Sequence, residues 1–289
     1  MNISMLSGLA ALGLATLPAI SSTTLAEAVE TPVSPAAITA AFSPGSASAS
    51  ASASTSGQAP VSFQVVQIVT EDKLTLAGSW FAPRKKGQPV PGVVLVHDAG
   101  SDRSSMDGVA DRLRKDGFAV VSVDLRGHGE SASSDLDWSA LDEGEQNAQW
   151  AFAQRDVNAA VNWLLAQNDV HSTRLTVVGH GAGCALAVRH MRDDENAIAV
   201  ALIEPKAECF GFKVNRDLAD LEGLPTYIVA SREAGKQGTE AMVQEANSNS
   251  GDEPFVELWL TTPPILTSRK TASRVSGFLK EHALPKKGK

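Results

Sequence analysis

Apolar and polar positions follow two different periodicities along this chain. After about residue 61, short runs of consecutive apolar residues alternate with longer stretches in which apolar residues recur every three or four positions. The short runs are typical of strands buried on both faces, and the longer stretches are typical of helices. The turn at residues 71–73 favours a hairpin between the first two runs. The pattern predicts strands at 63–70, 74–81, 93–96, 119–124, 175–178, 197–203, 226–230 and 255–260, and helices at 106–115, 150–167, 182–191, 239–246 and 272–283.

This alternation of strands and helices predicts parallel strands that are joined by right-handed crossovers. The fold class we expect is therefore α/β, with a doubly wound, mostly parallel sheet. The predicted elements lie within residues 61–284 and show no internal repeat, so we expect a single folded domain there. A short basic tail, residues 285–289, follows the last helix.

The first 28 residues have the outline of a secretory signal peptide. Residues 5–20 are almost wholly apolar, and Ala26-Glu27-Ala28 offers a cleavage site of the small-x-small type. No Lys or Arg precedes Lys73, so the amino terminus would supply the only positive charge of the signal. We predict export to the periplasm, the cell envelope or the medium; an unprocessed apolar tail is the alternative. A membrane span in the mature chain is not expected, because the apolar run is short and Pro18 interrupts it.

Residues 29–60 have the composition of a disordered linker. They are rich in Ala, Ser, Thr and Pro, and they bury too little apolar surface to offset the entropy of the chain. The whole chain carries a formal net charge of −8, and its basic residues form only short runs such as the C-terminal tail. Nucleic acid is therefore not expected as a partner, since phosphate binding needs a concentrated positive face.

Three motifs follow three of the predicted strands in order. Residues 93–100 read Val-Val-Leu-Val-His-Asp-Ala-Gly, residues 121–131 read Val-Ser-Val-Asp-Leu-Arg-Gly-His-Gly-Glu-Ser, and residues 179–183 read Gly-His-Gly-Ala-Gly. Together they resemble the α/β-hydrolase superfamily, in its esterase and serine-aminopeptidase-like branches. The resemblance covers residues 61–284 and implies an oxyanion loop, a strand-and-loop signature and a nucleophile elbow of the type Gly-x-Ser-x-Gly. Here the serine position is Gly181.

The resemblance also implies an acid after the sixth or seventh strand and a histidine after the last strand. Glu233 or Glu204 could stand at the acid position. The loop at residues 261–268 contains no histidine, and His282 falls near the end of the closing helix. Two of the three catalytic residues of the family are therefore missing, and we expect no catalytic residue. Glycine at position 181 would relieve the strain of the elbow, so Gly181→Ser is expected to lower stability without creating esterase activity.

Without catalytic residues, such a site could still bind a ligand. The backbone N–H groups of Ala99 and Ala182 would form the oxyanion hole, and only a minimal lid is expected after residue 203, which leaves the rim open. The main hypothesis is a non-catalytic protein that binds a small molecule or a protein at the former active-site rim. One alternative is a serine-type ester or peptide hydrolase that uses unrecognised residues. Another is a structural domain that is tethered to the envelope. The expected binding residues are His97, Asp98, Ala99, His180, Gly181 and Ala182.

Histidines after three central strands raise the question of a metal. His97, His128 and His180 would converge on one rim with Asp98 and Asp124 nearby, and imidazole with carboxylate suits zinc or iron. Active members of the resembled family often carry histidines at these positions without metal. We therefore expect no metal and no cofactor.

The remaining residues allow structural interpretations. Cys184 and Cys209 follow neighbouring strands and would form either a disulfide in an exported protein or two buried thiols. The serines of residues 101–105 are expected to cap the helix that follows. Asp124 and Arg126 are expected to brace their loop. The acidic stretch 135–145, flanked by Trp138 and Trp150, is expected to be irregular; these tryptophans would either cover the pocket or pack against the sheet.

Overall fold

The computed structural model describes residues 62–84, 87–221, 223–248 and 254–284. All of them belong to one compact unit, Thr55–Lys289. The predicted signal peptide (1–28), the predicted linker (29–60) and the basic tail (285–289) lie outside the described residues. Among the described helices, none is both long and apolar enough to cross a membrane.

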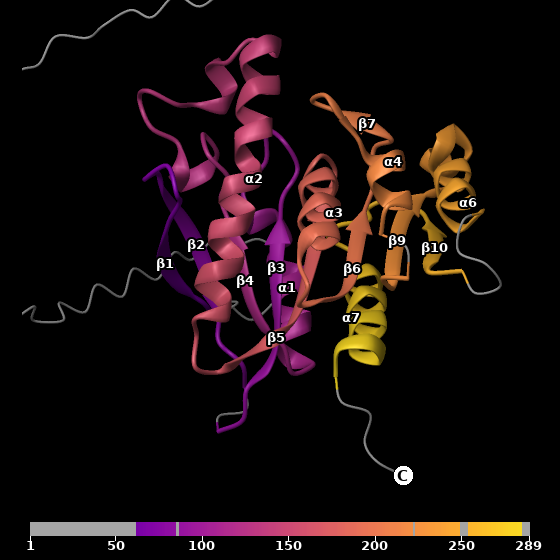
Figure 1. Cartoon of the computed structure of the whole chain (residues 1–289), viewed down its shortest axis with the longest axis horizontal. Coiled ribbons are helices and arrows are strands. Elements are labelled where there is room, and N and C mark those ends of the chain that lie inside the picture. The colour runs from indigo at the N-terminus through magenta and orange to yellow at the C-terminus, as the bar shows by residue number, and fades with distance from the viewer. Residues whose placement is uncertain (1–61, 85–86, 222, 249–253, 285–289) are drawn as a thin grey trace, which may run out of the picture. The chain divides into compact units, whose positions relative to one another are not determined.

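Eight strands form one sheet in the order β1-β2-β4-β3-β5-β6-β9-β10 (Figure 1). The first two strands pair with each other, and β2 with β4, in antiparallel fashion, whereas every other neighbouring pair is parallel. The predicted doubly wound, mostly parallel sheet is confirmed. Its strands are β1 (Gln64–Val69), β2 (Thr75–Phe81), β3 (Val90–Val96), β4 (Ala119–Val123), β5 (Val170–His180), β6 (Ala197–Ile203), β9 (Thr226–Ser231) and β10 (Val256–Thr261).

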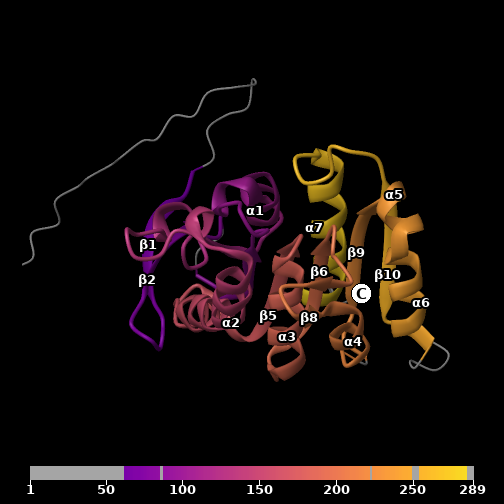
Figure 2. The same ribbon diagram turned by 90° about the horizontal axis from the view of Figure 1, so that it is seen from above.

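Helices cover both faces of the sheet and bury two separate apolar cores (Figure 2). Two helices, α1 (Asp107–Lys115) and α7 (Arg269–Ala283), pack together on one face. The central strands are fully buried between the layers, as their uninterrupted apolar runs require. The opposite face carries α2 (Glu143–Leu165), α3 (Gly183–Asp193), α4 (Val214–Ala219) and α6 (Glu240–Ser248).

Several segments differ from the sequence prediction; β5, for example, begins at Val170 rather than at residue 175. Helix α2 begins at Glu143 rather than at residue 150, so residues 143–145 are not irregular as predicted. Its first turn is polar and lacks the apolar spacing of a buried helix, but Asp142 and Glu145 form a reciprocal capping box that stabilises it. The short connection after β6 is ordered into a hairpin, β7 (Glu208–Cys209) and β8 (Phe212–Lys213), followed by α4.

Candidate functional site at the carboxyl ends of the central strands

The elbow keeps the tight turn of a nucleophile position without its side chain. Strand β5 ends at His180, Gly181 adopts φ +55°, and α3 begins two residues later. A Cβ on Gly179 would lie 2.6 Å from the Cα of Cys184, and one on Gly183 would lie 2.6 Å from the backbone oxygen of Val96. Both flanking positions therefore require glycine, because the backbone of neighbouring segments comes too close for a Cβ. These contacts fix the conformation of the turn.

The Asp98 carboxylate occupies the predicted oxyanion hole. Its Oδ1 accepts hydrogen bonds from the N–H of Ala182 at 2.6 Å and from the N–H of Ala99 at 2.9 Å. A Cβ built on Gly181 would overlap the carboxyl group of Asp98. The two donors that would stabilise a developing oxyanion, and the space in front of them, are thus filled by a side chain of the protein itself.

His97 and His128 tie two loops together. The Nε2 of His97 accepts the N–H of Leu125 at 3.0 Å, and the Nε2 of His128 accepts the N–H of Gly100 at 3.1 Å. Each Nδ1 lies within 2.9 Å of a backbone carbonyl oxygen, that of Asp98 or of Arg126, and therefore carries the proton. Burial lowers the pKa of His97 to about 4 and also lowers the pKa of His128.

With both ring nitrogens engaged, neither histidine has a lone pair for a metal ion. Asp124 is likewise committed, because it accepts the N–H groups of Arg103 and Glu130 and pairs with the Arg103 guanidinium. Within the described part of the chain, no three His, Cys, Asp or Glu side chains are arranged to hold a metal ion.

His180 is the rim histidine with a free ring nitrogen. Its Nδ1 is buried without a hydrogen-bond partner, and its Nε2 lies 3.8 Å from the Oε2 of Glu204. Glu204 has φ +53°, an unusual conformation for a residue with a side chain. Of the two predicted acid positions, Glu204 thus lies beside the elbow. Glu233 instead accepts a hydrogen bond from Gln237 on an exposed turn of helix.

An aromatic cluster packs around His128, between α2 and the β7–β8 hairpin. Phe210, in the turn of the β7–β8 hairpin, packs 5.3 Å from Trp138 and 5.1 Å from Trp150, measured between ring centroids. Trp138 stacks on His128 at 4.6 Å. Both tryptophans are buried, so they belong to the core. Asp98 itself stays half-buried, and the oxyanion loop remains reachable from solvent.

Cys184 and Cys209 are free thiols. The thiol of Cys184 is fully buried and lies 3.5 Å from the carbonyl oxygen of Ile203, whereas that of Cys209 lies 4.0 Å from the carbonyl oxygen of Ala182. Burial raises the pKa of Cys184 well above its usual value and that of Cys209 to about 11. Neither cysteine is a reactive thiolate near neutral pH.

A scan against protein-family models matches residues 93–279 to the alpha/beta hydrolase family. The chain belongs to this family. The resemblance carried by the three motifs is therefore confirmed, and the elbow, the oxyanion loop and the β4 loop can be named by their places in an α/β hydrolase.

Similar proteins support the fold and leave the activity open. An uncharacterised protein of Mycobacterium tuberculosis is 31% identical over 123 residues, which are 43% of this chain and 39% of the relative. This chain thus spans well under half the length of that relative. An esterase of Pyrococcus furiosus is 21% identical, with a TM-score of 0.58, over 77% of this chain and 94% of its own. A dienelactone hydrolase of Anabaena variabilis is 18% identical, with a TM-score of 0.60, over 77% and 98%.

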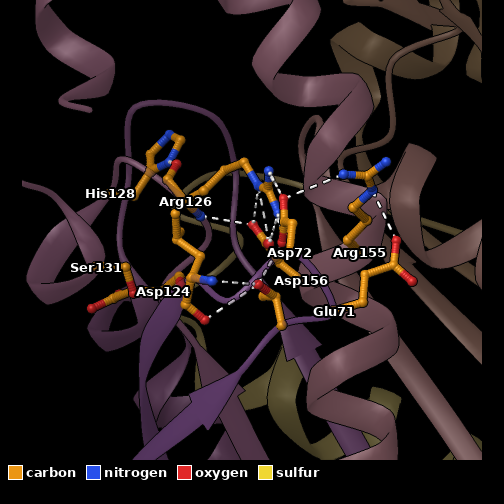
Figure 3. A network of polar contacts seen from close by, with 10 residues as sticks. Glu71, Asp72, Asp124, Arg126, His128, Ser131, Arg155 and Asp156 are labelled. Carbon is orange, nitrogen blue, oxygen red and sulfur yellow. Dashed lines mark hydrogen bonds and ion pairs between the residues drawn. The ribbon is translucent and has the colours of Figure 1, made fainter. Parts of the chain in front are cut away.

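A buried network of charges braces the loop after β4 of this α/β hydrolase (Figure 3). Arg126, whose side chain is only 5% exposed, binds the fully buried Asp156 at 2.7 Å and Asp72 at 3.0 Å. Arg155 reaches the same Asp72 from the surface and pairs with Glu71. The predicted bracing role of Arg126 is confirmed, but its partners were not predicted, since Asp72 and Asp156 lie far away in the sequence.

Two of the serines after the oxyanion loop donate hydrogen bonds to Asp102, the N-cap of the next helical turn. Both the backbone N–H and the hydroxyl of Ser104 donate to the Oδ1 of Asp102, and the hydroxyl of Ser105 donates to the carbonyl oxygen of Asp102. These contacts begin the helical turn that precedes α1. The prediction that these serines cap the helix is wrong, because Asp102 is the N-cap of this turn and α1 follows Met106 without a side-chain cap.

Proposed function

We propose that this α/β hydrolase does not hydrolyse esters or peptides, and that it binds a small molecule or a protein at the rim of the former active site. The observation that carries the proposal is the Asp98 carboxylate, which accepts both N–H groups of the oxyanion hole. A substrate carbonyl cannot enter the hole while this side chain fills it.

The missing catalytic groups support the same conclusion. Gly181 provides no nucleophile, and the loop after β10 provides no histidine that could act as its base. In a serine protease, removal of the serine or the histidine costs about a million-fold in rate. The oxyanion hole and binding alone retain about 10³–10⁴ over water, and here the hole is itself blocked.

The alternative of a serine hydrolase that uses other residues lacks geometric support. Among the described residues, no serine hydroxyl hydrogen-bonds a histidine ring, which is the usual arrangement for activating such a nucleophile. This alternative becomes one outcome of the following assay.

The test is hydrolysis of p-nitrophenyl acetate and butyrate, together with fluorophosphonate labelling, on the purified full chain. We expect neither activity nor labelling above a blank for the wild type, for Gly181→Ser, or for Asp98→Gly combined with Gly181→Ser. Labelling of one serine in the wild type would overturn the proposal. Turnover by Gly181→Ser alone would show that a base is present after all.

The same variants test whether the Asp98 side chain fills the oxyanion hole next to position 181. Gly181→Ser should lower the melting temperature, because its Cβ overlaps Asp98. Adding Asp98→Gly should remove part of this penalty, so that the two changes are not additive. Additive effects would show that the side chain of Asp98 does not obstruct position 181.

Export is part of the proposal. The apolar run at 5–20 and the small residues around 26–28 support cleavage of a signal peptide, and the Ser/Ala-rich residues 29–60 suit a tether. We expect the chain to be recovered outside the cytoplasm, with an amino terminus near residue 29. Fractionation of the expressing cells and N-terminal sequencing test this expectation, and an intact Met1 in the cytoplasmic fraction would contradict it.

A further inference from the structure

Two backbone N–H groups from different parts of the chain converge on one carboxylate oxygen. The N–H of Ala182 comes from the first turn leading into α3, and that of Ala99 comes from the oxyanion loop after β3. Such a pair is a ready-made site for an anionic oxygen, and the dipole of α3 adds to its attraction. Here the anion is supplied by the protein.

Asp98 is held in this place by little else. Its Oδ1 takes both hydrogen bonds, and no hydrogen bond or ion pair of the described residues involves its Oδ2. The residue is half-buried, so the carboxylate can regain water when the side chain rotates outward. Leaving the hole therefore costs Asp98 two hydrogen bonds, and a second carboxylate can replace both of them.

We infer that the rim is a carboxylate-binding site that Asp98 keeps closed. A ligand bearing a carboxylate displaces the Asp98 side chain and accepts the N–H groups of Ala99 and Ala182 in its place. The inference rests on the proposed function, because the ligand is bound at this rim and is not cleaved there. Beyond the proposed function, the inference names the chemical class of the ligand, a carboxylate, and the side chain that competes with it, Asp98.

The competition has a direct consequence for affinity. A carboxylate tethered next to the hole acts at a high effective concentration, so a simple free acid binds the wild type only weakly. Removal of the Asp98 carboxylate should strengthen binding at the same two donors. An isosteric amide should not, because its oxygen still accepts both N–H groups.

The experiment is a titration of the ¹⁵N-labelled full chain with acetate, followed by the amide signals of Ala99 and Ala182. Acetamide, which has the same shape without the charge, is the control ligand. We expect Asp98→Ala to bind acetate at least tenfold more tightly than the wild type, with both signals moving, and Asp98→Asn to behave as the wild type does. Equal responses from the Ala and Asn variants would overturn the inference.

A second measurement covers the case in which Asp98→Ala does not fold. In the wild type, acetate at high concentration should shift the Ala99 and Ala182 signals more than acetamide does. Absence of this selective shift, with or without a folded Ala variant, overturns the inference.

The two proposals fail in different experiments. Ester turnover or serine labelling would overturn the proposed function whatever acetate does. Lack of an acetate response in an inactive protein would overturn the carboxylate site alone.

Discussion

The two halves of the candidate site match the family pattern to very different extents. One half lies at the ends of β3, β4 and β5, where backbone groups, histidines and glycines are fitted to each other by hydrogen bonds and close contacts. The other half consists of the loops after β9 and β10. Among the described residues Glu233 bonds only Gln237, and the loop at residues 261–268 contains no histidine.

The difference separates what the fold needs from what the chemistry needs. The glycines and histidines of the first half hold central strands and their loops together, so the sheet depends on them whether or not a reaction takes place. The second half would have contributed only an acid and a base, and the sheet forms without them.

The largest effect is expected from a methyl group at Gly183. Its Cβ would meet the backbone oxygens of His97 and Val96, which cannot move without shifting β3. We expect Gly183→Ala to cost more than about 4 kcal/mol in the free energy of unfolding, or to prevent folding. Gly277→Ala in α7 is the control; its Cβ meets nothing within 4 Å, and it should gain about 0.5–1 kcal/mol. Urea unfolding measures both, and similar values would refute the claim that packing sets the elbow.

The charge network should respond next most strongly. Arg126→Met removes the charged partner of the buried Asp156, which keeps only the backbone N–H of residue 126, and should cost about 3–5 kcal/mol. Arg155→Met removes an arginine that shares Asp72 but is 40% exposed, and it should cost less than about 1 kcal/mol. Chemical denaturation of the two variants measures both losses in the free energy of unfolding. If the losses are equal, the buried pair has no special role in holding the β4 loop.

A smaller effect is expected from the protonation of His97. The unfolded chain takes up a proton near the ordinary pKa of 6.5, whereas the folded protein does so only near pKa 4. Unfolding therefore binds a proton between these values, and the free energy of unfolding should fall by about 3 kcal/mol on this account as the pH drops from 6.5 to 4.

Other groups act in the same pH range. The lowered pKa of His128 adds to the loss, while Asp107, whose pKa burial raises to about 6, opposes it as the pH falls. The contribution of His97 is therefore isolated by comparing urea unfolding of the wild type and His97→Gln from pH 7 to pH 4. An unchanged pH dependence in the variant would contradict the assignment.

The smallest effect is expected in the other half of the rim. Glu233 is exposed and, within the described part of the chain, bonds only its helical neighbour, so Glu233→Gln should change the free energy of unfolding by less than about 0.5 kcal/mol. It should also leave the acetate titration unchanged. A clear loss in either measurement would mean that this half still takes part in the site.

Local patterns predicted the fold and the turn between β5 and α3, whereas the contacts within the candidate site depend on residues far apart in the sequence. The elbow could be predicted because the glycines at 179 and 183 have a fixed spacing. The start of α2 was missed because its first turn is polar, although the Asp142 and Glu145 pair is a recognisable capping signal. The place of the Asp98 carboxylate depends on a side-chain rotation and on a donor 84 residues away, which no local pattern reports.

The reciprocal histidine ties limit how the rim can move. Because His97 holds the amide of Leu125 and His128 holds the amide of Gly100, neither loop can open without breaking a bond to the other. The two loops should therefore exchange their amide hydrogens with solvent as one cooperative unit. Access to the hole then comes from rotation of a single side chain on a rigid frame, on a timescale far shorter than that of loop opening.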